Sequence, residues 1–346
     1  YNSFYKLRKE VKFMTNKDGY TFELNSNVMR EKVKFKNRYG IELVGDLYVP
    51  KNKNGKLSAL VVSGAFGAVK EQTSGVYANE LASHGFVTLA FDNSFTGESG
   101  GDVRNVASPD IYTEDFSAAV DYFTTLDYVD ENRIGIMAIC GLSGMAITAM
   151  TVDPRIKAVA TASMYDMSNS IGKGFMNSYT LEDKQAILEH VANERTQAAK
   201  RGSYIPGPHE IMFDENHNIL PIAGLPNELP EGEVNPILKT FFDYYKTERG
   251  YHERSINSTT AWNSTTPYSF FAFPLYTNYE LLGDRKILLV AGENAHSLYH
   301  SQTVVDLVPN NAELLVVPNA DHADLYDKLE LIPMDKIVEF FKENFK

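Results

Sequence analysis

Short apolar segments alternate with predicted helices along most of the chain. The apolar runs lie at residues 57–63, 86–91, 133–139 and 156–163. The helices predicted between them cover residues 75–83, 113–126 and 141–152. Runs of this length separated by helices are typical of βαβ units, and strands that are apolar throughout belong to a parallel sheet covered on both faces. We therefore predict an α/β fold with a mostly parallel central sheet flanked by helices.

Two local patterns refine this prediction. Residues 31–50 alternate between apolar and polar positions around a turn at residues 37–40, which predicts an antiparallel pair of strands. The helix at residues 113–126 is expected to begin at Thr113, because Glu114 and Asp115 suit the positive end of a helix dipole.

The alternation stops after Met164 and resumes near Arg285. Apolar runs at residues 287–291 and 313–317 and a helix at residues 333–345 complete the predicted core. We therefore divide the chain into a first core segment (1–163), an insertion (164–284) and a second core segment (285–346). Within the insertion we predict helices at residues 181–200 and 235–247. An insertion this long is usually a cap or lid over a site, and the alternative is a subdomain that only buries surface.

Composition excludes several classes of function. The net charge of −12 and the lack of a basic stripe argue against a nucleic-acid partner. No apolar run reaches the roughly 18 residues that a membrane span needs. A single cysteine excludes an internal disulfide framework and a multi-cysteine zinc site. We expect a small-molecule substrate, and the sequence leaves a homo-oligomer open. We expect a cytoplasmic location, with secretion left open because residue 1 is not Met.

No cofactor or metal is expected. The glycine-rich run at residues 96–101 resembles a phosphate loop only superficially, because it lacks the Lys-Ser/Thr ending and the strand-to-helix context of such loops.

The strongest chemical signal is Cys140, the only cysteine. It stands where an apolar strand passes into a helix through a turn of small residues. This arrangement is typical of a nucleophile elbow, which exposes the nucleophile above the sheet and at a helix N-terminus, where the dipole favours a thiolate. Ser143 is the alternative nucleophile, since Gly141-Leu142-Ser143-Gly144-Met145 is one substitution short of Gly-x-Ser-x-Gly. A buried and inert thiol is the structural alternative.

His322 is the predicted general base. It lies in the loop after the last predicted strand, from which a parallel sheet can present an imidazole to the elbow. The orienting acid is expected to be Glu293, the only carboxylate at the end of the preceding strand, in agreement with the order nucleophile, acid, histidine. Asp321 and Asp324 are the alternatives.

Backbone N–H groups must also bind the developing oxyanion. Gly141 supplies one, and the loop after the 57–63 strand supplies the other through Ala65 or Phe66. Aromatic residues, namely Tyr165, Tyr204 and Trp262, are expected to form an apolar pocket for the acyl group.

The elbow Ala138-Ile139-Cys140-Gly141-Leu142-Ser143-Gly144-Met145-Ala146 resembles that of the dienelactone-hydrolase-related and polyketide-transferase-like group of α/β-hydrolases. Further similar stretches lie at residues 69–72, 95–101, 163–167, 244–252 and 322–327. The resemblance implies an α/β-hydrolase fold with a helical cap, Cys140 as nucleophile, His322 as base and Glu293 in the acid region. Ala138 and Ser143 stand in place of glycines of the group pattern, and Ala295 stands where many hydrolases carry an aspartate.

Together these features predict an enzyme that cleaves an ester, lactone or thioester through a covalent Cys–His mechanism. Two alternatives remain open at this point. The chain is either an acyltransferase or thioesterase of the same group, or a ligand-binding protein without catalysis on a hydrolase scaffold.

Overall fold

The computed structural model describes residues 19–345, which are organised around one eight-stranded sheet of order β1-β2-β4-β3-β5-β6-β9-β10. Its strands are β1 (Val28–Lys36), β2 (Glu42–Pro50), β3 (Leu57–Ser63), β4 (Val87–Phe91), β5 (Val129–Ile139), β6 (Ile156–Ala162), β9 (Lys286–Gly292) and β10 (Ala312–Val317). β1 and β2 form the predicted antiparallel hairpin, and β2 also pairs antiparallel with β4. All other neighbours in the sheet are parallel, so the predicted mostly parallel sheet is confirmed.

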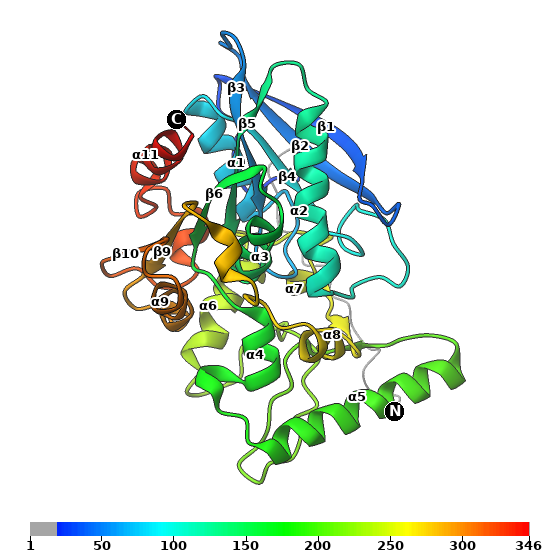
Figure 1. The fold of residues 1–346 in the computed structure, drawn as a ribbon. Helices are drawn as coiled ribbons and strands as arrows, with labels where there is room; N and C mark the ends of the chain where they lie inside the picture. The colour runs from blue at the N-terminus through cyan, green and yellow to red at the C-terminus, as the bar shows by residue number, and fades with distance from the viewer. Residues whose placement is uncertain (1–18, 346) are drawn as a thin grey trace.

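Helices cover both faces of the sheet, and each face has its own hydrophobic core. One face packs against α2 (Pro109–Thr124), α3 (Ser143–Val152) and α9 (Leu298–Leu307). The other face packs against α1 (Thr73–Ser83), α10 (Asp324–Asp327) and α11 (Met334–Asn344). Figure 1 shows α2 and α3 together on the viewer's side of the sheet. Burial on both faces explains why the central strands are apolar at nearly every position.

Residues 164–284 contribute no strand to this sheet. They contain α4 (Met167–Lys173), η2 (Phe175–Asn177), α5 (Leu181–Arg201), β7 (Pro206–Gly207), α6 (Pro236–Tyr245), α7 (Ile256–Thr259), β8 (Trp262–Asn263), α8 (Pro267–Ala272) and η3 (Tyr279–Leu282). The two helices predicted here correspond to α5 and α6. The segment α4 to α8 gathers at one end of the sheet, with α5 farthest out (Figure 1). Thr180 begins α5 with a capping box, in which Thr180 and Asp183 bond to each other's backbone N–H.

The predicted start of α2 is wrong by four residues. The helix begins at Pro109, where proline is favoured because the first helical N–H needs no partner. Asp115 consequently lies in the second turn and is fully buried. Its carboxylate accepts hydrogen bonds from the Asn37 side chain at 2.9 Å and the Ser94 backbone at 2.8 Å. Asp115 therefore ties the β1–β2 turn to the loop after β4.

A buried ionic cluster fixes the loop between β3 and α1. Lys70 is inaccessible to solvent, and its Nζ lies 2.8 Å from Glu71 and 3.2 Å from Asp92 and also contacts Glu98. The Lys70 backbone N–H donates to Asp92 at 2.8 Å. Arg254 of the insertion pairs with Glu71. The cluster therefore holds the loop against the end of β4 and against the insertion.

Replacing Lys70 by Met should lower the free energy of unfolding by about 3–5 kcal/mol, because it leaves the buried Asp92 without its cation and leaves Glu71 with Arg254 alone. Urea denaturation followed by circular dichroism measures this change. The control is Lys34→Met, which breaks an exposed pair with Glu42 and should cost less than about 1 kcal/mol. Equal losses in the two variants would contradict a structural role for the cluster.

Candidate active site

Cys140 occupies a sharp turn at the end of β5. Its φ is +55°, a left-handed conformation that is strained for a residue with a Cβ atom. The 3-10 turn η1 (Cys140–Leu142) and then α3 follow directly. The carbonyl of Cys140 accepts a hydrogen bond from the backbone N–H of Tyr165 at 3.0 Å. The strand-turn-helix geometry predicted for the nucleophile elbow is therefore present at Cys140.

The small residues around Cys140 permit a close approach of neighbouring loops. A Cβ on Gly141 would lie 2.6 Å from Cβ of Phe66 and 2.9 Å from Sδ of Met167. A Cβ on Gly144 would lie 2.7 Å from Cδ1 of Leu275. Ser143 is the first residue of α3, is fully buried and does not line the cavity at Cys140. Cys140, rather than Ser143, faces that cavity.

Two backbone N–H groups point at the sulfur of Cys140. Burial raises the pKa of the thiol, and the N–H groups of Gly141 and Phe66 act against this increase. Of the two residues predicted for the second donor, Phe66 provides the N–H, while the neighbouring Ala65 lines a separate, smaller cavity. The arrangement can bind an oxyanion that forms beside Cys140.

His322 is completely buried in the loop after β10, and a tyrosine hydroxyl stands between it and Cys140. The Nε2 atom of His322 lies 3.0 Å from the Oη atom of Tyr326, which belongs to α10. The same hydroxyl interacts with the Cys140 thiol and acts to lower its pKa. Ser163, at the end of β6, donates to the carbonyl of His322 at 2.7 Å and fixes the loop. Cys140 and His322 are thus connected through Tyr326.

The other ring nitrogen of His322 meets a hydroxyl group instead of a carboxylate. Its Nδ1 lies 2.6 Å from Oγ of Ser297, a buried residue two positions after Ala295. Glu293 does follow β9 as expected, but its side chain is exposed and accepts a hydrogen bond from the backbone of Asn319. The structure therefore does not bring Glu293 to His322.

The two alternative acids also point elsewhere. Asp321 accepts a hydrogen bond from Thr240 at 2.9 Å and from the backbone N–H of His322 at 2.6 Å. Asp324 pairs with Lys328. Neither carboxylate contacts the imidazole of His322, so Ser297 alone orients Nδ1.

Burial makes both reactive groups neutral. It raises the pKa of the Cys140 thiol to about 11, and the interactions with Tyr326 and with the backbone of Gly141 and Phe66 only partly offset this. Burial also lowers the pKa of His322 well below its ordinary value, and the nearby His296 and His300 lower it further. The expectation of a thiolate at the helix N-terminus therefore does not hold for the resting site, since the cost of desolvation outweighs the dipole.

A cavity of about 120 Å³ opens beside the sulfur of Cys140. It is lined by Phe66, Cys140, Tyr165, Met167, His209, Glu210, Leu225, Phe241, Tyr245, Asn257 and Tyr326. Most of these residues come from the insertion. Tyr165 is present as predicted, with its hydroxyl 2.5 Å from Nε2 of His296.

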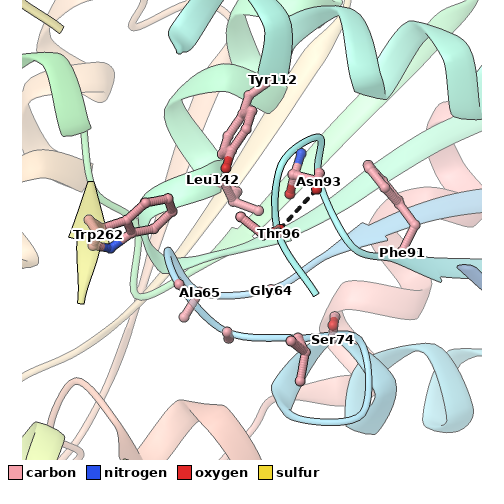
Figure 2. Close-up of a pocket in the computed structure, with 12 residues that line it drawn as sticks. Gly64, Ala65, Ser74, Phe91, Asn93, Thr96, Tyr112, Leu142 and Trp262 are labelled. Carbon is pink, nitrogen blue, oxygen red and sulfur yellow. Dashed lines mark hydrogen bonds between the residues drawn. The ribbon is translucent and has the colours of Figure 1, made fainter. Parts of the chain in front are cut away.

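The other two predicted pocket residues lie outside this cavity. Tyr204 is 41% exposed, because it precedes β7 on the outer surface of the insertion. Trp262 is buried and stacks on the ring of Phe66, with ring centroids 4.1 Å apart. Figure 2 shows Trp262, Ala65 and Leu142 around the smaller cavity of about 10 Å³, which has room for about one water molecule. Trp262 thus packs against the ring of Phe66 without lining the cavity at Cys140.

Sequence reasoning missed Tyr326 and Ser297. Tyr326 lies four residues after His322, within the 322–327 stretch that carries part of the family resemblance. Ser297 had no signal of its own apart from its place shortly after β9.

Within residues 19–345, no cluster of three or more His, Cys, Asp or Glu side chains is arranged to hold a metal ion. No helix in that part of the chain is long and apolar enough to cross a membrane.

Comparisons with known proteins relate the chain to several others. A family model described as X-Pro dipeptidyl-peptidase (S15 family) matches residues 39–208. The PA2218 protein of Pseudomonas aeruginosa is 48% identical over 96% of this chain and 85% of its own length. YcjY of Escherichia coli is 32% identical over 91% of this chain and 99% of its own length. The acyltransferase drtE of Aspergillus calidoustus is 24% identical over 91% of this chain and 96% of its own length.

Solved structures agree with these relationships. The crystal structure of PA2218 superposes with a TM-score of 0.87 and covers 96% of this chain and 98% of its own. The α/β hydrolase GrgF from Penicillium sp. sh18 superposes with a TM-score of 0.71 at 18% identity, covering 92% of this chain and 99% of its own. The predicted α/β-hydrolase fold is confirmed.

Alkylation of Cys140 by iodoacetamide should accelerate about tenfold per pH unit between pH 8 and pH 10, because only the thiolate reacts and the raised pKa keeps it scarce. Intact mass spectrometry measures the single adduct that one cysteine allows, and circular dichroism verifies the fold at each pH. N-acetylcysteine, the control, should level off near its ordinary pKa of about 8.5. A protein profile that levels off below pH 7 would instead demonstrate a resting thiolate.

Proposed function

Because this chain belongs to the family that contains PA2218 and YcjY and has the α/β-hydrolase fold, we propose that it is an enzyme that cleaves ester, lactone or thioester bonds through an acyl-cysteine intermediate. One observation carries the proposal. A line of polar atoms runs from Sγ of Cys140 through Oη of Tyr326 and Nε2 of His322 to Oγ of Ser297, beside a cavity and two backbone N–H groups.

The first step begins from a neutral thiol and a neutral imidazole. The thiol proton passes to Oη of Tyr326 as the hydroxyl proton of Tyr326 passes to Nε2 of His322. Tyr326 therefore stays neutral, as its strongly raised pKa requires, and His322 becomes an imidazolium. Ser297 accepts a hydrogen bond from Nδ1–H and keeps the ring in the tautomer that leaves Nε2 free to accept the proton.

The sulfur forms a bond to the substrate carbonyl carbon as it loses its proton. The carbonyl oxygen becomes an oxyanion that the N–H groups of Gly141 and Phe66 stabilise. Collapse of this intermediate breaks the bond to the leaving group, which takes the proton back from His322 through Tyr326. A water molecule then attacks the thioester carbon and gives a proton to His322 by the same route. The second intermediate breaks its carbon–sulfur bond, the acid leaves, and the sulfur takes the proton back from His322 through Tyr326.

The nature of the acceptor is a second question. The relative drtE is named an acyltransferase and aligns over most of this chain, which favours an acceptor other than water as the alternative. The chemistry up to the acyl-cysteine is the same in both cases, so the two functions differ only in which nucleophile enters the cavity second.

The direct test is turnover of S-butanoyl-N-acetylcysteamine with mass spectrometry of quenched samples. The wild-type protein should hydrolyse the thioester and carry a butanoyl group on Cys140 during turnover. Cys140→Ala should abolish both signals, and His322→Asn should lower kcat by about 100- to 10,000-fold. Glu293→Gln, at an exposed carboxylate, is the control and should change kcat less than about twofold. Undiminished turnover by Cys140→Ala would disprove covalent catalysis, and butanoyl transfer to an added alcohol would identify a transferase.

Tyr326→Phe should lower kcat by roughly 100-fold with little change in KM, because it removes the hydroxyl that connects thiol and imidazole. Steady-state kinetics with the same thioester measures the effect. Tyr244→Phe is the matched control, since Tyr244 is an equally buried tyrosine that packs on Tyr326 but does not line the cavity. Wild-type kcat in Tyr326→Phe would mean that His322 takes the proton from Cys140 directly.

A further inference from the structure

The cavity beside Cys140 contains one carboxyl group, that of Glu210, which the mechanism does not use. Glu210 follows β7 in the insertion. Among residues 19–345, its carboxylate accepts a long hydrogen bond of 3.4 Å from Oγ of Ser170 on α4 and no other that the structure describes. Glu210 forms no ion pair with any of the residues 19–345 that the structure describes. Glu210 is only partly exposed to solvent. A carboxylate in such a position without a cation or several donors is costly, so it favours a positively charged partner from outside the chain.

The surroundings of Glu210 suit a cation. None of the residues that line the cavity is a lysine or an arginine. Burial lowers the pKa of the adjacent His209 to about 4, so this imidazole is neutral and offers Glu210 no charge. The remaining wall is largely aromatic, formed by Phe66, Tyr165, Phe241, Tyr245 and Tyr326. Aromatic faces combined with a carboxylate attract ammonium groups and disfavour anions.

The electrostatics of the cavity agree with this arrangement. Burial raises the pKa of Glu210 to about 7, which reflects a carboxylate with too few donors. Its negative charge also contributes to the raised pKa of Tyr165 in the same wall. A positive charge placed in the cavity would satisfy the carboxylate and restore its ionised form at neutral pH.

The cavity volume limits what can enter. An apolar protein cavity of about 150 Å³ accommodates benzene. The volume of about 120 Å³ at Cys140 therefore admits a short chain and excludes a bulky group.

From these observations we propose that the enzyme selects short acyl groups that carry a terminal ammonium, which Glu210 binds while the carbonyl lies at Cys140. This inference rests on the acyl-transfer function proposed above and names its substrate class. Glu210 is a specificity-determining residue in this scheme, and it takes no part in the transfer of protons to the sulfur.

The test compares N-acetylcysteamine thioesters of equal size and different charge. 3-Aminopropanoyl and butanoyl differ by an ammonium in place of a methyl group, and succinyl provides the anion. The pair 6-aminohexanoyl and heptanoyl extends the comparison to a longer chain. We expect kcat/KM for an ammonium substrate to exceed that for its neutral isostere by at least about tenfold, as a charge-assisted hydrogen bond would give. The succinyl thioester should be the poorest substrate.

Glu210→Gln should reduce the ratio of kcat/KM for the ammonium substrate to kcat/KM for its neutral isostere to about one. Glu215→Gln changes an exposed carboxylate of the same segment and should leave the ratio unchanged. Two outcomes would overturn the inference. One is Cys140-dependent turnover without any preference for the ammonium, which leaves the proposed function intact. The other is an equal loss of kcat/KM for all substrates in Glu210→Gln, which would indicate that Glu210 acts as a general acid or base.

A binding measurement separates the inference from the proposed function. Cys140→Ala removes the proposed nucleophile. NMR titration of this variant with n-butylammonium, n-butanol or n-butanoate therefore measures ligand binding in the absence of catalysis. Saturable binding of n-butylammonium that Glu210→Gln abolishes supports the inference even if no thioester is turned over. Equal binding of n-butylammonium and n-butanol, or binding that survives Glu210→Gln, overturns it.

Discussion

The turn at Cys140 is the constraint on which the site depends. With φ at +55°, the residue leaves β5 and enters η1 within one position, which directs the sulfur out of the sheet. β3 and β6 flank β5, so the loops after these strands bring Phe66 and Tyr165 to either side of the turn. Gly141 allows the first of these loops to come close enough for its N–H to reach the sulfur. The strained backbone of Cys140 and the missing side chain of Gly141 therefore position the two N–H donors, those of Gly141 and Phe66.

Burial determines how the site can react. Burial keeps both the thiol of Cys140 and the imidazole of His322 uncharged, so the site contains no thiolate before a substrate binds. In the mechanism proposed above, charge appears only when a carbonyl occupies the space beside Cys140 and accepts the electron pair of the sulfur. The backbone N–H groups are already in place at that moment and require no reorganisation, which is the condition under which such donors are most effective.

The sequence predicted the parts of the molecule that depend on periodicity or on chain position. Cys140, His322 and Phe66 all follow parallel strands, and the carboxyl ends of such strands meet at one edge of the sheet. Glu293 satisfies the same positional rule, yet its side chain turns outward to the backbone of Asn319, and Ser297 takes the place beside His322. The direction of a loop side chain depends on packing from distant segments. For the same reason the pattern identified Tyr165 as a pocket residue but placed the exposed Tyr204 there too.

The isolation of Cys140 has a consequence for redox chemistry. The chain contains no second cysteine, so a sulfenic acid formed at this sulfur has no resolving thiol within the molecule. Its neutral and enclosed state slows attack by peroxide, because oxidation requires the thiolate and access. Reduction of the oxidised sulfur then requires a thiol from outside the chain that reaches it through the cavity beside Cys140. A molecule that occupies this cavity would protect Cys140 from oxidants and, equally, delay its reduction.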